Sequence, residues 1–243
     1  MVKKIIFVTI FIILIGFAGW RVLDARDKPI TNNQEKDQLI ENTEIGFDKS
    51  KHSTSEPGSL WWIVNKNRPL PDGYKPNDLI VPSVSLRLNA SAEQMHLRKD
   101  TATALESLFA AAKQSGHNLY LASGFRSAAY QKVLYDGYVS KDGQAAADKY
   151  SARPGTSEHQ TGMAADVGRP DGQCELEICF GDTTEGAWVK EHAHEYGFIV
   201  RYEQGKESIT TYQYEPWHLR YVGTELAIEL KNSNLTMEEF FGL

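Results

Sequence analysis

The stretch SEHQTGMAAD, residues 157–166, predicts both a local fold and a chemical site. Gly162 allows the chain to turn, and the small apolar residues over 163–167 predict a short strand directly after that turn. His159 comes from the loop before the turn, and Asp166 points back from the strand. Imidazole and carboxylate groups are both zinc ligands, so we expect the two side chains to meet at a metal ion.

The segments around this stretch alternate between helices and short strands. Apolar residues at helical spacing predict a helix over 101–115, which Gly116 ends, and a strand over 118–122 follows. Further helices are expected near 128–138, 144–150, 185–196, 224–231 and 236–241, and strands near 198–202 and 218–222. This irregular order predicts an α+β domain, with a small, mainly antiparallel sheet that carries the zinc site and is flanked by helices.

A third candidate ligand lies in the stretch EPWH, residues 215–218. Glu215 precedes His218 by three residues, and we expect Pro216 to stiffen a turn that lets both side chains approach one point. Three protein ligands and one open position are typical of catalytic zinc. Taken singly, each histidine is more often structural, and Glu215 is either a general base or a residue that orients His218.

Other histidines do not fit this pattern. His192 and His194 form an HxH pair near the end of an expected helix, where residues two apart point in different directions. We therefore leave both out of the site. His52, His96 and His117 have no partner pattern in the sequence.

Three motifs in order resemble those of a known family. Residues 157–166 match every position of the SxHxxGxAxD signature of the VanY-type zinc D-alanyl-D-alanine carboxypeptidases. Residues 215–218 are similar to the family's ExxH motif, and residues 123–127 resemble its SGYRS turn, with Phe125 in place of tyrosine. The resemblance covers roughly residues 60–243 and includes both D,D-carboxypeptidases and L,D-carboxypeptidases of tetrapeptide stems.

The resemblance implies a role for each matching residue. One zinc ion per chain would be held by His159, Asp166 and His218, with Glu215 as the catalytic base and Arg126 as an electrophilic or carboxylate-binding residue. Substrate contacts are expected from Gln131, Ser157 and Tyr202. The chemistry agrees, because zinc activates water, a carboxylate can accept its proton, and a guanidinium binds carboxylates or an oxyanion. The competing interpretation of Arg126 is a buried ion pair.

The N-terminus predicts export. Lys3 and Lys4 precede an apolar run from Ile5 to Trp20, so residues 1–23 are expected to be a membrane anchor with its N-terminus in the cytoplasm, or else a cleaved signal peptide. Residues 24–58 are polar and predict a flexible linker to a domain at 59–243. This places the domain at the extracytoplasmic face of the membrane, where Cys174 and Cys179 form either a disulfide or two thiols.

Three functions are therefore compared. The leading one is a zinc carboxypeptidase that removes terminal D-alanine from peptidoglycan stem peptides. The alternatives are a cell-wall endopeptidase and a non-catalytic zinc domain that binds wall peptides. A formal net charge of -6 argues against nucleic acid as a partner. The choice between D,D and L,D specificity depends on the shape of the pocket.

Overall fold

The computed structural model describes residues 46–243. The chain divides into two units, Met1–Gly46 and Phe47–Leu243, and the second is described here. The predicted membrane segment 1–23 and the first part of the predicted linker lie outside the described residues. Within residues 46–243, no helix has both the length and the apolar character needed to cross a membrane.

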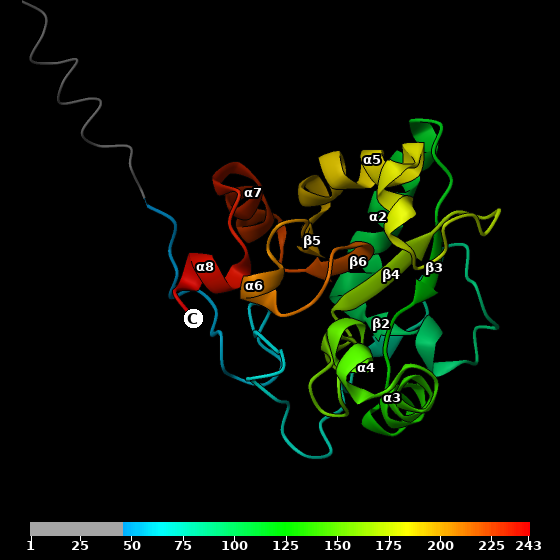
Figure 1. Cartoon of the computed structure of the whole chain (residues 1–243). Coiled ribbons are helices and arrows are strands. Elements are labelled where there is room, and N and C mark those ends of the chain that lie inside the picture. The colour runs from blue at the N-terminus through cyan, green and yellow to red at the C-terminus, as the bar shows by residue number, and fades with distance from the viewer. Residues whose placement is uncertain (1–45) are drawn as a thin grey trace, which may run out of the picture. The chain divides into compact units, whose positions relative to one another are not determined.

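A four-stranded antiparallel sheet forms the centre of the unit (Figure 1). Its strands, in spatial order, are β3 (Tyr120–Ser123), β4 (Ala164–Gly168), β6 (Glu215–Tyr221) and β5 (Phe198–Tyr202). A second sheet pairs β1 (Leu79–Ile80) with β2 (Leu97–Arg98). The predicted α+β class with a small antiparallel sheet is therefore confirmed.

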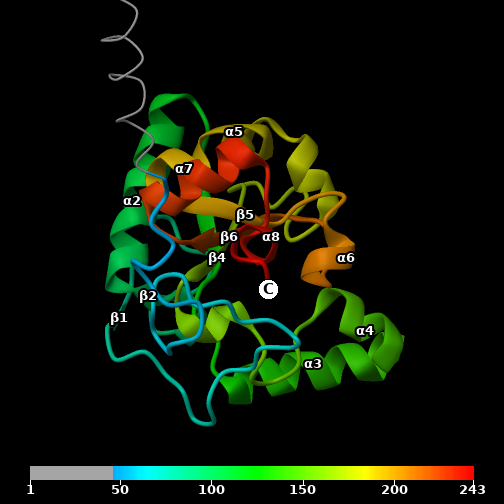
Figure 2. The ribbon, with the colours of Figure 1, turned by 90° about the vertical axis from the view of Figure 1, so that its left-hand side faces the viewer.

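Helices cover the sheet and its ends. In Figures 1 and 2, α5 and α7 lie toward the top, whereas α3 and α4 lie together at the bottom. The helices are α2 (Lys99–Gln114), α3 (Ala128–Asp142), α4 (Gln144–Tyr150), α5 (Thr184–His192), α6 (Glu207–Thr210), α7 (Thr224–Ser233) and α8 (Met237–Phe241). Short 3-10 turns are η1 (Glu93–Met95), η2 (Glu158–Thr161), η3 (Ile178–Asp182) and η4 (Ala193–Tyr196).

The two faces of the sheet differ in chemistry because side chains alternate along each strand. On one face, Val167 of β4 and Leu219 of β6 join a core that includes Leu105 and Leu108 of α2. Each such apolar side chain contributes about 1.5–3 kcal/mol through burial. The other face carries polar side chains, among them Asp166, His218 and Arg220. The alternation thus separates a packed apolar face from a face that can carry a site.

The segment before the first strand is part of this unit. Trp61 is buried in a second apolar cluster with residues of α7 and α8, and its indole nitrogen donates to the carbonyl of Val222 at 3.0 Å. Phe47 packs against Trp61 and Phe240 with ring centroids 5.2 Å from each. Phe47, which falls within the predicted linker, is therefore packed against aromatic residues of this unit.

One local prediction was wrong. Residues 215–218 were expected as a turn, but they begin the strand β6. Val200 of β5 pairs with Leu219 of β6, and Tyr202 pairs with Glu215. Between these two pairs β5 advances by two residues, whereas β6 advances by four. The extra residues form an irregularity in the ladder, which accommodates a proline that has no N–H to donate.

Candidate metal centre and active site

The turn η2 and the strand β4 position two of the predicted ligands. His159 lies in η2, and Gly162 ends that turn in the left-handed region, with φ +71°. A Cβ on Gly162 would lie 3.0 Å from side-chain atoms of Arg98 and Leu79, so this position favours glycine for both conformation and space. The chain then enters β4, where Asp166 is 3% exposed.

The third predicted ligand lies opposite Asp166 on the neighbouring strand. His218 of β6 is its register partner, and His218 Nδ1 lies 3.1 Å from Asp166 Oδ1. His159 Nε2 lies 3.2 Å from the other carboxylate oxygen, Oδ2. The structure therefore brings the three residues together, with one ligand atom from each lying within 4.8 Å of the others.

Backbone contacts fix which nitrogen of His159 faces the site. Its Nδ1 donates to the carbonyl of Gly124 at 2.6 Å, which leaves the lone pair of Nε2 directed toward Asp166. Gly124 has no space for a side chain, because a Cβ there would lie 2.4 Å from the carbonyl oxygen of His96. The close approach of these backbone segments therefore orients the imidazole.

The donor set fits a zinc ion. Tetrahedral ligands about 2.1 Å from zinc lie about 3.4 Å apart, and one ligand atom from each of the three residues already lies within 4.8 Å of the others, so small side-chain movements bring them to a common ion. His159 Nε2 and Asp166 Oδ1 are buried and have no hydrogen-bond partner among the described residues. Buried polar atoms without partners are unfavourable, and coordination to a cation would satisfy both.

The charges of the two histidines differ in the metal-free site. Burial, together with the charge of the neighbouring Arg126, lowers the pKa of His159 to about 4. Burial also lowers the pKa of His218, but the adjacent carboxylates of Asp166 and Glu158 favour the protonated ring, outweigh this effect and raise the pKa to about 9. His159 is therefore neutral at pH 7, whereas His218 must release a proton to bind a metal.

Glu215 lies beside this group but is not one of its three ligands. Its Oε2 is 3.8 Å from His218 Nδ1. Burial raises the pKa of Glu215 to about 7, although the charge of His218 acts against that shift. The irregularity in β6 explains how residues three apart reach the same place, since a regular strand would point them to opposite faces. A carboxyl with a pKa near neutrality suits general base catalysis.

Arg126 enters the site from the turn between β3 and α3. Its backbone N–H donates to the carbonyl of His159 at 3.3 Å, and its Nη2 lies 3.8 Å from Asp166 Oδ2. Within the described residues this is the one carboxylate that its side chain approaches to within 4.0 Å, and the separation is long for a direct ion pair. The side chain is 20% exposed, so its donors are available to an anionic group in the cavity.

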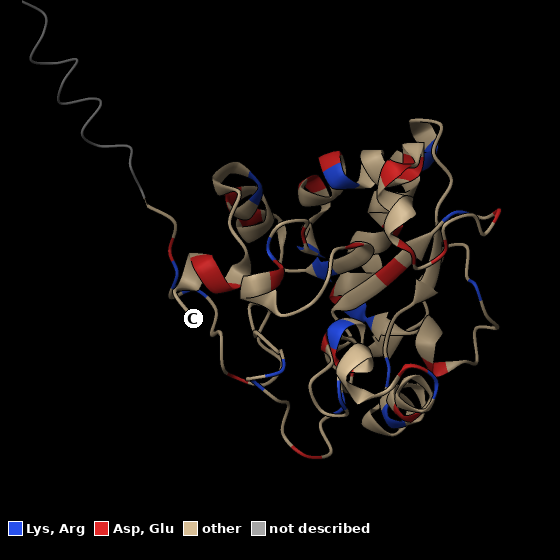
Figure 3. Ribbon diagram, viewed as in Figure 1, with Lys and Arg blue, Asp and Glu red and all other residues tan. Residues whose placement is uncertain are grey.

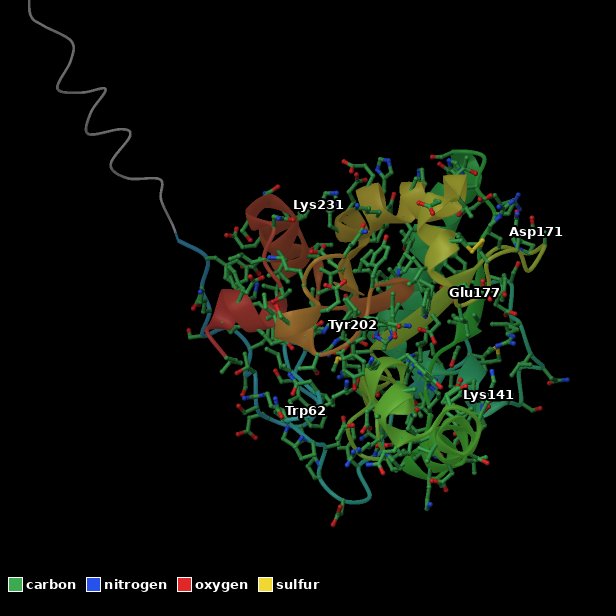
Figure 4. The ribbon with its side chains drawn as sticks, in the orientation of Figure 1. Trp62, Lys141, Asp171, Glu177, Tyr202 and Lys231 are labelled. Atoms are coloured by element: carbon green, nitrogen blue, oxygen red, sulfur yellow. A yellow bond between two sulfur atoms is a disulfide. The ribbon has the colours of Figure 1, made fainter. Side chains whose placement is uncertain are left out.

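A cavity of about 150 Å³ joins these residues to the predicted substrate contacts. Ser157, Gln131 and Tyr202 all line it. Gln131 Nε2 donates to the carbonyl of Ala152 at 2.8 Å, so its amide oxygen is left as an acceptor. Tyr202, labelled in Figure 4, lies at the end of β5, and its ring centroid is 4.8 Å from that of His218.

The structure adds cavity residues that the motifs did not single out. Tyr212 stacks on Tyr202 with ring centroids 4.5 Å apart, and its buried hydroxyl has no hydrogen-bond partner in residues 46–243. Leu176 reaches the cavity from the loop closed by the disulfide between Cys174 and Cys179. Both lie in loops outside the signature motifs, so their position could not be inferred from sequence spacing.

Comparisons to known proteins match most of the described chain. A family model described as VanY, D-alanyl-D-alanine carboxypeptidase, matches residues 94–224. The Bacillus subtilis protein YodJ, named as a carboxypeptidase, is 44% identical over 76% of this chain and 68% of its own length. The motifs of this chain thus lie within a region of extended similarity.

Two solved structures are also similar to this chain in sequence and fold. The LdcB LD-carboxypeptidase has a TM-score of 0.73 and 44% identity, covering 76% of this chain and 87% of the LdcB chain. A VanY D,D-pentapeptidase from a VanB-type resistance cassette, solved with Zn(II), has a TM-score of 0.62 and 31% identity over 74% of this chain and 97% of its own. Family model, sequence relative and solved structures agree: this chain belongs to the VanY family of D-alanyl-D-alanine carboxypeptidases.

Proposed function

We propose that the protein is a zinc-dependent carboxypeptidase that removes terminal D-alanine from peptidoglycan stem peptides. The observation that carries the proposal is the placement of Glu215 and Arg126 in the same cavity as His159, Asp166 and His218. A metal-binding domain without catalysis would need the three ligands but would have no use for a buried carboxyl with a pKa raised to about 7.

The catalytic steps follow from the positions of these residues. A zinc ion held by the three ligands would supply Lewis acidity, polarising the scissile carbonyl and acidifying water. Glu215 accepts a proton from the attacking water and then returns it to the amine of the departing D-alanine. Arg126 offers a fixed charge and a planar set of donors to an anionic oxygen. Each residue thus has one task that its neighbours do not perform.

The size of the cavity supports removal of one terminal residue. At about 150 Å³ it is smaller than the roughly 300–1,000 Å³ of most drug-sized ligand sites. The hydroxyls of Ser157 and Tyr212 and the guanidinium of Arg126 are donors suited to a free carboxylate, whereas the oxygen of Gln131 is suited to a substrate N–H. These features favour a carboxypeptidase over an endopeptidase, whose groove must admit chain on both sides of the cleaved bond.

Similarity ranks the two candidate substrates. The LdcB LD-carboxypeptidase shares 44% identity with this chain, compared with 31% for the VanY D,D-pentapeptidase. We therefore put forward the stem tetrapeptide as the first substrate to test, with the pentapeptide in parallel. The location that we propose is the extracytoplasmic face of the membrane, which is supported by Lys3, Lys4 and the apolar run from Ile5 to Trp20.

The direct test uses the full chain in detergent with stem tetrapeptide and pentapeptide. Mass spectrometry of the products should show loss of one alanine from at least one peptide. The Glu215→Gln variant should leave both peptides intact while still binding zinc. If wild-type chain with bound zinc releases no D-alanine from either peptide, the proposal is refuted; products cut within the stem would indicate an endopeptidase.

A further inference from the structure

Four charged side chains are buried together behind the proposed metal site. Arg201 and Arg220 are 1% and 0% exposed, and Glu158 and Glu238 are 1% and 3% exposed. Figure 3 shows that charged residues occur on the ribbon of the central sheet as well as on the surface helices. Buried charges require close partners, so the contacts of each group define what it can do.

The two arginines use one oxygen of Glu158. Arg201 Nε and Arg220 Nη1 donate to Glu158 Oε1 at 2.9 and 2.8 Å. The remaining nitrogens of Arg201 form a two-pronged contact with Glu238 of α8, at 2.9 and 2.6 Å. Arg220 Nη2 donates to the carbonyl of Trp62 at 2.7 Å. The carboxylate of Glu158 is therefore held in a fixed orientation by donors on β5 and β6.

This orientation directs the second oxygen of Glu158 toward a proposed metal ligand. Glu158 Oε2 and His218 Nε2 are 3.6 Å apart. Both atoms are buried, and neither has a hydrogen-bond partner in the described part of the chain. The separation is longer than a hydrogen bond, so a small rotation of the ring or the carboxylate is needed to form one. Each atom is thus available to the other as a hydrogen-bond partner.

We propose that Glu158 is a positioning residue, which accepts a hydrogen bond from Nε2–H of His218 and so presents Nδ1 of that ring to the metal. This inference rests on the proposed zinc function. A proton held on Nε2 leaves the lone pair of the neutral imidazole on Nδ1, the atom 3.1 Å from Asp166 Oδ1. The carbonyl of Gly124 does the equivalent for His159 through the opposite ring nitrogen. Each histidine then has one buried acceptor that sets its tautomer.

The two arginines explain why a buried carboxylate can stay charged and accept this hydrogen bond away from solvent. Two buried positive charges offset the negative charges of Glu158 and Glu238, so the group as a whole carries no formal excess. Arg201 and Arg220 also occupy the other oxygen of Glu158, which leaves Oε2 as the one directed at His218. The network therefore extends from α8 through Arg201 to the metal site.

The test compares two charge-neutralising variants of this network in the full chain. In Glu158→Gln the two arginine donors hold the amide oxygen, so the NH2 group takes the place of the acceptor that faces His218. Glu238→Gln removes a carboxylate that contacts Arg201 but has no contact with His218 among the described residues. Competition with a zinc-binding dye should show zinc affinity reduced about 10- to 100-fold in Glu158→Gln, the range for lost outer partners of a metal ligand. Glu238→Gln should bind zinc as the wild type does, even where its thermal unfolding temperature falls. Wild-type affinity in Glu158→Gln, or equal losses in both variants, would overturn the inference.

A second measurement uses only the wild-type chain, so it does not depend on whether a variant folds. Long-range proton–nitrogen NMR of the zinc-loaded wild-type chain identifies which ring nitrogen of His218 carries a proton. We expect the proton on Nε2, and a proton on Nδ1 would overturn the inference. The two proposals can fail separately. A wild-type chain that binds zinc but releases no D-alanine refutes the catalytic function, whereas the NMR result on the tautomer of His218 still stands.

Discussion

Asp166 on β4 and His218 on β6 face each other as register partners, with 3.1 Å between Asp166 Oδ1 and His218 Nδ1. Residues 52 positions apart in the sequence thus become neighbours through the pairing of two strands. A shift of the register by one residue would turn one of the two side chains to the apolar face. The sheet that forms the core therefore also determines the geometry of the candidate metal site.

Removal of a ligand should abolish metal binding. His218→Ala deletes one of three ligands, and we expect zinc affinity to fall by more than the roughly 100-fold seen when an outer partner is lost. His192→Ala is a matched control, because His192 lies on α5 and pairs with Glu195 at 2.9 Å. Metal content after dialysis and dye competition measure the effect. Equal zinc retention in both variants would contradict the assignment of His218.

Zinc affinity should rise with pH. His218 has a pKa raised to about 9 in the metal-free site, because the adjacent carboxylates of Asp166 and Glu158 outweigh the lowering effect of burial. Zinc must displace the proton on Nδ1, so the apparent affinity should increase about tenfold per pH unit below pH 9 and level off above it. His159, with a pKa lowered to about 4, should add no proton release above pH 6. Calorimetry in buffers of different ionisation enthalpy counts the released protons, and a pH-independent affinity would contradict this account.

Glu215→Gln should separate catalysis from metal binding. The amide keeps the size of the side chain but cannot accept a proton, so we expect kcat to fall by about 100-fold or more with zinc still bound. In the wild type, activity should decline as the pH falls through the pKa of Glu215, which burial raises to about 7, because the protonated form is no base. Bound zinc would shift this acidic limb of the pH–activity profile to lower pH. Undiminished kcat in the variant would rule out Glu215 as the base.

The disulfide should affect both stability and substrate binding. Cys174 and Cys179 close a short loop in which Leu176 lines the cavity and Glu175 accepts from the hydroxyl of Tyr120 at 2.6 Å. Replacing both cysteines with serine should lower the free energy of unfolding by about 2 kcal/mol, as loop-closure entropy predicts for so small a loop. It should also raise KM, because the wall formed by Leu176 loosens. Reduction of the wild type should reproduce both effects; an unchanged KM would show that the loop does not shape the cavity.

The three clustered residues could be predicted from the sequence because the motifs that carry the family resemblance are short and local. His159 and Asp166 lie in one stretch of ten residues, and Glu215 and His218 lie in another of four. Helix α4 (Gln144–Tyr150) and strand β5 (Phe198–Tyr202) also occupy the predicted ranges. In each case, the signal comes from periodicity or from residues close together in the chain.

Other features depend on contacts that the sequence does not encode locally. Strand β6 contains Pro216, a residue normally excluded from central strands, and the ladder tolerates it through an irregularity that only the pairing with β5 reveals. Glu158 and Tyr212 lie next to the site through tertiary packing, Glu158 against two arginines more than 40 positions away. Propensity and motif spacing carry no information on such distant partners.

The central claim is zinc-dependent release of terminal D-alanine, and one measurement tests it most directly. The full chain is stripped of metal with a chelator, incubated with stem tetrapeptide and pentapeptide, and assayed for free D-alanine before and after stepwise addition of zinc. We predict no release from the stripped chain, and activity that rises with added zinc and saturates at one ion per chain. Full release from the stripped chain, or none after zinc is restored, would contradict the account.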